Sequence, residues 1–509
     1  MTDQPFANAA AMIPARYAKR FFVVPLGLEN GVLRVAHRHD AGPSVLGELS
    51  LLLGLEVTGE PYSEAHLADL LQRTYGVGAD AIDRMDANDA RPDTGTAAAH
   101  ARSGYVQREL VDDLADDASI VSVVNELLMR AQAEGATDIH LEPHENRVRV
   151  RFRIDGMLIE IAVPEGLVHY HSVVVSRIKV MANLDIAERR LPQDGRIKAT
   201  VDGVQNEYRV SVLPTQFGET VDIRVLTNSS ILTGLSGLGM WEDEQAFIRQ
   251  TLASPYGVIL VTGPTGSGKT TSLYSFLNLM NETSRKIITI EDPIEYHLDG
   301  ITQLQVHPKI ELTFARGLRS MLRHDPDVMM VGEIRDQETA ETVIRVALTG
   351  HLVFSTVHTN DAPSTPARLL NMGIEPYLLA SSVRCILAQR LVRKVCLNCA
   401  EPDTREYVKE LANDLGTRGY DGDPDFRTGA GCDQCHQTGF SGRTAIFEIL
   451  PVTAKVQELI LSRAPASALR GELTAVGTGS LRERGLALAA RGETSVSEVL
   501  RVTAGQDGV

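Results

Sequence analysis

The chain has 509 residues, of which 43% are apolar, 5% aromatic and 23% charged. At roughly 150 residues per domain, this length predicts about three domains, and the apolar fraction excludes a chain that is disordered throughout. The 50 basic and 66 acidic residues give a net charge of −16, which argues against a protein that coats DNA but does not exclude a local basic surface.

Neither a membrane span nor a secretory signal is expected from the sequence. The longest apolar stretches, such as residues 258–261, fall far short of the roughly 20 residues needed to cross a bilayer. The first ten residues contain an acid and no apolar core, unlike a secretory signal. We therefore expect a soluble cytosolic protein that reaches a membrane only through a partner.

Residues 1–75 predict a small N-terminal module of α/β or α+β type. Short apolar runs at 21–24 and 45–55 are followed by a helical pattern at 63–75. Residues 76–106 contain few large apolar side chains, a composition typical of a flexible linker.

Residues 107–226 predict a second module. Apolar side chains recur at helical spacing from Ser119, which can cap a helix, to Gly135, which can end it. Arginine and apolar residues then alternate strictly at 147–154, which predicts a strand, and the Asp-Gly turn at 155–156 predicts a hairpin. The period of two places four arginines on one strand face, for which solvent exposure is the simplest explanation: Arg147, Arg149, Arg151 and Arg153.

Two further strands are expected between residues 201 and 226, and they carry Arg209 and Arg224. Residues 227–240, rich in Gly, Ser and Thr, predict a second linker. The remaining part, 241–509, alternates helical stretches with apolar strands at 258–262, 286–290, 328–331 and 352–356. Such alternation predicts βαβ units around a largely parallel sheet, an α/β fold.

The segment GPTGSGKT at 263–270 fits the phosphate-binding pattern G-x-x-x-x-G-K-[ST] between a predicted strand and a predicted helix. Its glycines allow several backbone N–H groups to point at one phosphate, and the helix N-terminus adds positive potential. Lys269 is expected to contact the β and γ phosphates, and the Thr270 hydroxyl to ligate Mg²⁺. The expected nucleotide-binding residues are Gly263, Pro264, Thr265, Gly266, Ser267, Gly268, Lys269, Thr270 and Thr271.

Two acidic strand ends follow the loop. One strand ends at Glu333, as a Walker B element does, and another at 287–291 leads to three carboxylates in five residues, the last of them Glu295. Each could be an ordinary acidic loop, but next to a phosphate-binding loop a role at the metal or the attacking water is favoured. His358, at the end of a parallel-type strand, is expected on the ligand-binding edge, where it can sense the γ-phosphate or orient a glutamate.

Four of the five cysteines form two C-x-x-C pairs, Cys396 with Cys399 and Cys432 with Cys435. Four thiolates satisfy tetrahedral Zn²⁺ and leave no open position, so the pattern predicts a structural zinc site. A redox pair or coincidence is the alternative. Cys385 is expected to be a core thiol.

Five motifs together resemble the secretion ATPases that drive type II secretion and type IV pilus assembly, over about residues 105–450. Besides the phosphate loop they are ITIEDPIE, LRHDPDVMMVGEIRD, TGHLVFSTVHTNDA and the tetracysteine followed by TGFSGRTAIFE. The resemblance implies a homohexamer with a RecA-like P-loop motor domain preceded by a PAS-like α+β domain. It also implies that Glu295 activates water, that Glu333 lies near Mg²⁺ and His358 near the γ-phosphate, and that Arg209 and Arg224 contact the nucleotide.

The predicted organisation is therefore an N-terminal partner-docking module, a PAS-like domain at 107–226 and a motor at 241–509. The motor includes a zinc lobe at 394–440 and a C-terminal helical region at 445–509. The expected function is an ATPase that powers type II secretion from the cytoplasmic face of the bacterial inner membrane, docked by its first module on a platform protein. The expected cofactors are ATP, Mg²⁺ and structural Zn²⁺.

Two other functions stay open. Type IV pilus assembly shares the motor motifs, whereas pilus retraction motors lack the tetracysteine lobe. A DNA uptake or translocation motor would need a basic pore or an added DNA-binding module, and the sequence shows neither, so no nucleic-acid partner is expected.

Overall fold

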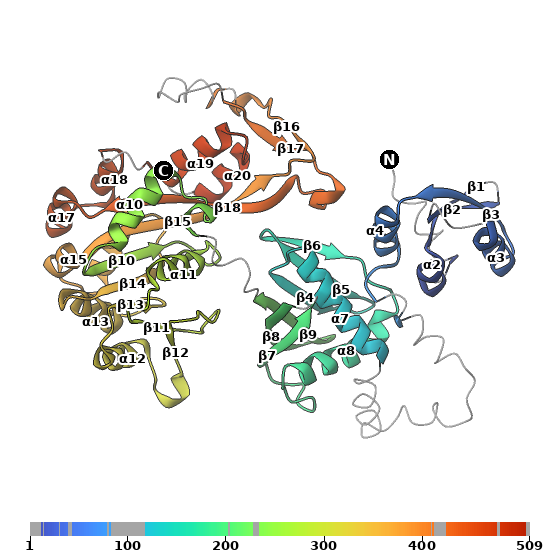
Figure 1. Cartoon of the computed structure of the whole chain (residues 1–509), viewed down its shortest axis with the longest axis horizontal. Coiled ribbons are helices and arrows are strands. Elements are labelled where there is room, and N and C mark those ends of the chain that lie inside the picture. Colours follow the sequence, from blue (N-terminus) through green and yellow to red (C-terminus); the bar gives the residue numbers. More distant parts are fainter. Residues whose placement is uncertain are drawn as a thin grey trace. The chain divides into compact units, whose positions relative to one another are not determined.

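The computed structural model describes residues 12–13, 15–29, 31–38, 43–78, 81–82, 118–201, 204–226, 234–408, 410–411, 424–475 and 479–504. They divide into two compact units, Met1–Thr227 and Asn228–Val509 (Figure 1). Most of the predicted linker at 76–106, and residues 227–233 of the second one, lie outside the described residues. Within the described ranges, no helix is both long and apolar enough to cross a membrane.

The N-terminal module is a three-stranded sheet of order β1-β2-β3 with helices. Strands β1 and β2 are antiparallel, whereas β2 and β3 are parallel. Val23, Leu33, Leu49 and Leu67 are among its buried core residues. The elements are α2 (Ala15–Phe21), β1 (Val23–Glu29), β2 (Val32–Arg38), α3 (Pro43–Leu53), β3 (Glu56–Tyr62) and α4 (Glu64–Tyr75).

The second module of the first unit is a six-stranded antiparallel sheet of order β6-β5-β4-β9-β8-β7. Helices α7 and α8 contact each other, and their apolar side chains join those of the sheet in one core. The elements are α7 (Ala118–Ala133), β4 (Asp138–Pro143), β5 (Val148–Ile154), β6 (Met157–Ile161), α8 (Leu167–Met181), β7 (Gln193–Val201), β8 (Val204–Thr215) and β9 (Gly218–Leu226). Strand β7 is one that the sequence pattern did not reveal.

The arginine row of β5 is more than an exposed face. Arg149 and Arg151 both pair with Glu142 of β4, the former with an Nε–Oε2 distance of 2.8 Å, and both are about three-quarters buried. Arg147, whose side chain is 62% exposed, fits the solvent-exposed interpretation.

Both predicted linkers are shorter than the sequence suggested. Val77, Ala81 and Ile82 are buried in the core of the second module, and the Val77 N–H donates to the carbonyl of Ala162 at 3.1 Å. In the second unit, residues 234–240 contain helix α9 (Gly234–Gly237) and three buried side chains. A composition average conceals such scattered apolar residues, although each is enough to fasten a segment to a core.

The second unit is built on a seven-stranded sheet of order β12-β11-β13-β14-β10-β15-β18, in which only the β15–β18 pair is antiparallel. Its strands are β10 (Gly257–Thr262), β11 (Ile287–Glu291), β12 (Thr302–Gln305), β13 (Val328–Val331), β14 (Leu352–Val357), β15 (Val383–Val395) and β18 (Phe440–Pro451). The central strands are continuous apolar runs because both faces of a parallel sheet are covered.

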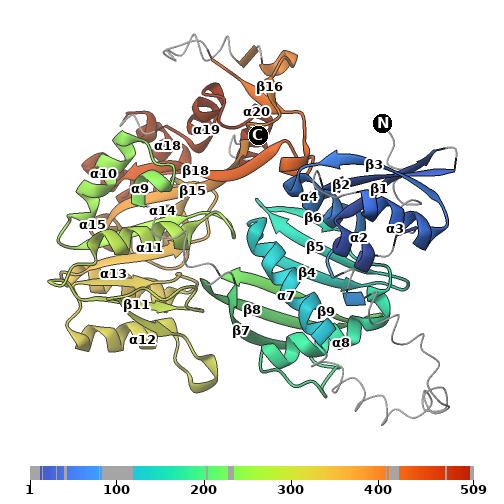
Figure 2. The same ribbon diagram turned by 45° about the vertical axis from the view of Figure 1, so that its right-hand side comes forward.

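Successive residues of β10 alternate between two cores. Val258 and Leu260 pack with α12 and α13 on one face, and Ile259 and Val261 pack with α10 and α11 on the other. Figure 2 shows these four helices beside the strands of the sheet. The helices of this part are α10 (Glu242–Leu252), α11 (Lys269–Met280), α12 (Phe314–Met321), α13 (Gln337–Leu348), α14 (Ser364–Asn371) and α15 (Pro376–Ser382), with the 3₁₀ turns η3 (Pro308–Ile310) and η4 (Leu322–His324).

The last part of the chain adds a small lobe between β15 and β18 and a set of C-terminal helices (Figure 1). The lobe contains β16 (Ala400–Pro402), β17 (Arg427–Gly429) and η5 (Asp433–Cys435), and the helices are α17 (Ala454–Leu461), α18 (Ala466–Ala475), α19 (Leu481–Ala490) and α20 (Val496–Thr503). Val408 and Phe426 of the lobe share a core with α19 and α20.

Candidate functional site

The phosphate-binding sequence forms the turn between β10 and α11, at the carboxyl edge of the sheet. Gly263, Gly266 and Gly268 have φ values of +150°, +77° and +88°. A Cβ added at Gly263 would lie 2.6 Å from the carbonyl oxygen of Gln389, and one at Gly268 would lie 2.8 Å from its Nε2. The loop therefore lies so close to β15 that only glycine fits at these two positions.

The charged and polar groups of this loop fit a phosphate chain. The Lys269 Nζ donates to the carbonyls of Gly263 at 2.8 Å and Pro264 at 2.9 Å, and burial lowers its pKa to about 8. Ser267 is only 3% exposed, and within the described part of the chain its hydroxyl has no hydrogen-bond partner. A lysine, an unsatisfied buried hydroxyl and the N-terminus of a twelve-residue helix converge on one turn.

Glu333 and His358 meet because the strands that precede them, β13 and β14, are hydrogen-bonded neighbours. The His358 Nε2 lies 3.2 Å from one carboxylate oxygen of Glu333, and the Arg335 guanidinium contacts the other. Burial opposes ionisation of Glu333, but hydrogen bonds from Arg335 and His358 hold its pKa below the usual range. The carboxylate is thus ionised and suited to a divalent cation.

The three carboxylates after β11 have different surroundings. Glu291 is 3% exposed and accepts hydrogen bonds from three side chains, and its burial raises its pKa. Asp292 is more exposed and lies 3.6 Å from Arg335. Glu295 is partly exposed in the loop that follows the strand. Pairing relieves the charge of Asp292, but Glu295 adds to burial in raising the pKa of Glu291, so part of the repulsion expected among the three acids remains.

The four paired cysteines come together in the lobe, with their sulfur atoms all within 4.8 Å of one another. The Sγ–Sγ distances are 3.9 Å for Cys396 and Cys432, 3.8 Å for Cys399 and Cys435, and 3.7 Å for Cys432 and Cys435. Tetrahedral Zn²⁺ with Zn–S bonds of about 2.3 Å requires sulfur separations of about 3.8 Å. The cluster therefore has the dimensions of a zinc site.

Nitrogen donors surround the sulfur atoms. The side-chain amide of Asn398 lies 3.2 Å from the Cys432 Sγ and helps to lower the pKa of that thiol to about 6. The backbone N–H groups of Cys432 and Gly439 each lie 3.2 Å from the Cys435 Sγ. Such donors stabilise thiolates, the form that binds a metal.

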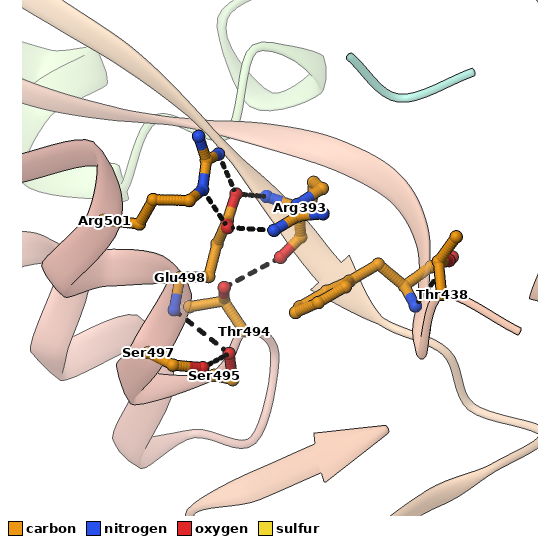
Figure 3. A network of polar contacts seen from close by, with 8 residues as sticks. Arg393, Thr438, Thr494, Ser495, Ser497, Glu498 and Arg501 are labelled. Atoms are coloured by element: carbon orange, nitrogen blue, oxygen red, sulfur yellow. Dashed lines mark hydrogen bonds and ion pairs between the residues drawn. The ribbon is translucent and has the colours of Figure 1, made fainter. Parts of the chain in front are cut away.

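A buried ion-pair network fastens the base of this lobe to α20. Figure 3 shows Glu498 between the guanidinium groups of Arg393 and Arg501, with nitrogen–oxygen distances of 2.5 and 2.7 Å. The Arg393 guanidinium also lies 4.2 Å from the centre of the Phe440 ring, and its carbonyl accepts from Thr494. Because Arg393 lies near the end of β15, the strand that leads to Cys396, the network ties the metal-ligating segment to the C-terminal helices.

Residues 113–501 match the model of a family described as "Type II/IV secretion system protein". The chain belongs to this family.

Relatives in the family carry both of the expected names. The Type IV pilus assembly ATPase PilB of Myxococcus xanthus is 41% identical over 505 residues, which cover 97% of this chain and 86% of that protein. A Type II secretion system protein E of Aeromonas hydrophila is 41% identical over 507 residues, which cover 99% of this chain and 98% of that protein. The protein of that name from Pseudomonas aeruginosa is 48% identical over 390 residues, 76% of either chain.

Solved structures extend the likeness to the fold. The ATPase DotB of Legionella pneumophila superposes with a TM-score of 0.56 at 21% identity, covering 75% of this chain and 95% of that one. The pilus retraction motor PilT, solved with bound ADP, superposes with a TM-score of 0.53 at 25% identity, and the match covers 76% of this chain and 98% of that one. As a secretion ATPase with a RecA-like α/β motor, this chain is an ATP-hydrolysing enzyme.

Apart from Glu295 and the four cysteines, the structure places the predicted site residues in three groups. The loop residues lie together at the end of β10, and Glu333 and His358 form a pair in the same unit. Arg209 and Arg224 lie in the first unit, directly opposite each other on β8 and β9. Like charges in this relation repel, which an anion between them would relieve, although Arg224 also binds Asp138 at 2.9 Å.

Sequence reasoning missed two residues at the site: Gln389, which forms the wall of the phosphate loop, and Arg335. Glu291 belongs to the expected acidic cluster, but the sequence did not show that it is buried. Arg335 has a local signal, because it follows Glu333 by two residues. Gln389 has none, since its role depends on the register between β15 and β10.

Proposed function

We propose that this secretion ATPase is the motor of a type II secretion system. It works as a homohexamer at the cytoplasmic face of the inner membrane and drives protein export through a platform protein that contacts residues 1–75. The observation that carries the proposal is the glycine-framed loop beside the Glu333–His358 pair, in a chain of which 99% is matched by the Type II secretion system protein E of Aeromonas hydrophila.

Lys269 and the loop amides hold the triphosphate. When nucleotide arrives, the Lys269 Nζ exchanges the carbonyls of Gly263 and Pro264 for the β and γ phosphates. Thr270 and Glu333 would hold Mg²⁺, which neutralises charge that develops on the phosphate oxygens. His358 keeps Glu333 oriented through the 3.2 Å contact and is placed to respond to the γ-phosphate.

Glu295 orients the attacking water and receives its proton, because it follows the buried end of β11 and is partly exposed. Arg209 and Arg224 offer two adjacent guanidinium groups to the phosphates when the PAS-like module closes on a motor domain. The four cysteines would hold one structural Zn²⁺ through their thiolates, which would leave no open position for chemistry.

The residue roles are tested by steady-state phosphate release from assembled rings. Lys269→Ala and Glu333→Ala should each abolish turnover, and Lys269→Ala should also weaken nucleotide binding. Glu458→Gln, which alters only an exposed pair on α17, is the matched control and should leave the rate unchanged. Near-normal turnover in either site variant would overturn these assignments.

Type IV pilus assembly is the second candidate, because a PilB relative covers 97% of this chain. A deletion strain separates the two functions when it is complemented with the wild-type gene or the Lys269→Ala form. Loss of secreted enzymes with intact surface pili supports type II secretion, and the reverse supports pilus assembly. Binding to duplex DNA on filters at 150 mM salt would instead favour a DNA motor.

A further inference from the structure

The loop that carries Glu295 is attached to the helix of the phosphate loop through a buried polar cluster. The Tyr274 hydroxyl, on α11, donates to Glu291 at the end of β11. One phenol therefore contacts the strand end through its hydroxyl and, through its ring, Tyr296, the residue next to the proposed catalytic Glu295.

Gln303 of β12 makes the other half of this attachment. Its Nε2 donates to Glu291 at 3.1 Å and to the carbonyl of Tyr296 at 2.9 Å, while its Oε1 accepts from the Leu298 N–H at 2.8 Å. The loop from 292 to 298 is thus held at two backbone atoms, the Tyr296 carbonyl and the Leu298 N–H, and Leu298 is itself buried.

Burial makes these contacts strong and specific. Tyr274 is fully buried and Glu291 is 3% exposed, and the ring of Tyr274 packs edge-on against Tyr296 with a centroid distance of 6.2 Å. Thr289 donates a further hydrogen bond to Glu291 at 2.6 Å. A buried carboxyl group with three donors is costly to disturb, because any unmatched donor would lack water to bind.

We propose that Tyr274, Glu291 and Gln303 are positioning residues for hydrolysis. They hold the loop of Glu295 at a fixed distance from the helix that begins at Lys269. The distance between the bound triphosphate and the carboxylate of Glu295 is then held constant. The inference rests on the proposed role of Glu295 and adds three residues that do not themselves touch the substrate.

A double-mutant cycle tests the proposal on the full-length protein. Tyr274→Phe removes the hydroxyl and should lower kcat about ten- to hundredfold, because a displacement of about 1 Å at a reacting group has that effect. The dissociation constant of a fluorescent ATP analogue should stay within twofold. In single-turnover phosphate release, adding Tyr274→Phe to Glu295→Gln should cause no further loss, since the hydroxyl acts through Glu295.

The matched control is Tyr208→Phe, the same change at a fully buried tyrosine of β8. Among the described residues its hydroxyl has no hydrogen-bond partner, so kcat should be unchanged. Hydrogen exchange gives a readout independent of activity: Tyr274→Phe should speed exchange of the Leu298 amide, whose partner Gln303 shares Glu291 with Tyr274, and Tyr208→Phe should not.

Three results would overturn the proposal: a normal kcat in Tyr274→Phe, a loss of nucleotide affinity in place of kcat, or an equally large loss in the Glu295→Gln background. Failure of the proposed function is distinguishable, because Glu295→Gln alone would then retain full turnover.

Discussion

Replacing Glu498 by glutamine should loosen the C-terminal helices and the base of the zinc lobe together. The Glu498 side chain is fully buried between Arg393 and Arg501 (Figure 3). Although burial opposes its ionisation, the two guanidinium groups lower its pKa from 4.5 to about 2. Glutamine keeps the shape and removes the charge, so both arginines lose their anionic partner.

The magnitude follows from that pKa. The difference between 4.5 and about 2, at roughly 1.4 kcal/mol per pH unit, corresponds to about 3.5 kcal/mol. The Arg501 side chain is 59% exposed, so solvent screens part of this energy and we expect about 2–3 kcal/mol. Because the folded-state pKa is depressed, the stabilisation is present above pH 4.5 and is lost as the pH falls toward 2.

Native-state hydrogen exchange is the suitable assay, since a chain with several domains and a metal site does not unfold in one step. At pH 7, amides of α19 and α20 should exchange about 30- to 150-fold faster in Glu498→Gln, from tenfold per 1.4 kcal/mol. In Glu458→Gln, the same change in an exposed pair, exchange should differ less than about threefold. Unchanged exchange in α20, or equal effects of both variants, would refute this account of the network.

Three further predictions concern other parts of the second unit. Purified protein should contain one zinc per chain. When a chelator removes the zinc, as measured with a colorimetric zinc indicator, the amides of residues 396–435 should lose their protection against hydrogen exchange. Protection that survives complete removal of the zinc would contradict a structural metal. Gly268→Ala should weaken binding of a fluorescent ATP analogue at least tenfold, because φ is +88° and the new Cβ would lie 2.8 Å from Gln389, whereas Gly471→Ala, with nothing within 4 Å, should bind normally. Burial raises the pKa of Glu448 to about 7, so its contribution to stability is full below pH 4.5 and is lost as the pH rises through 7. The ratio of wild-type to Glu448→Gln exchange rates for the amides of β18 should therefore rise from pH 5 to 8, and a constant ratio would show that Glu448 does not titrate there.

Local patterns predicted much of the motor. Residues 263–270 form the expected turn between strand and helix, because the glycine spacing of the motif is specific to that backbone conformation. Glu333 and His358 could be placed on the same edge because parallel strands end together, and the structure confirms that they meet. The cysteine spacing likewise predicted a four-thiol cluster.

Contacts between distant segments were beyond such reasoning. Tyr274 meets Glu291 across 17 residues, and Arg393 meets Glu498 across 105, because the packing of α11 on β11 and of α20 on β15 sets these distances. No periodicity in the sequence predicts which residues of a helix and of the strand beneath it lie opposite each other. Strand β7 was missed for a similar reason, since its stretch of polar, charged and glycine residues gains its strand character from pairing with β8.

The most direct test of the central claim is equilibrium binding of a fluorescent ATP analogue across a magnesium series, with phosphate release measured on the same samples. We predict saturable binding and magnesium-dependent release in the wild-type protein, and loss of both in Lys269→Ala. Wild-type protein that binds no adenine nucleotide at any magnesium concentration, or a Lys269→Ala variant that binds and hydrolyses normally, would contradict it.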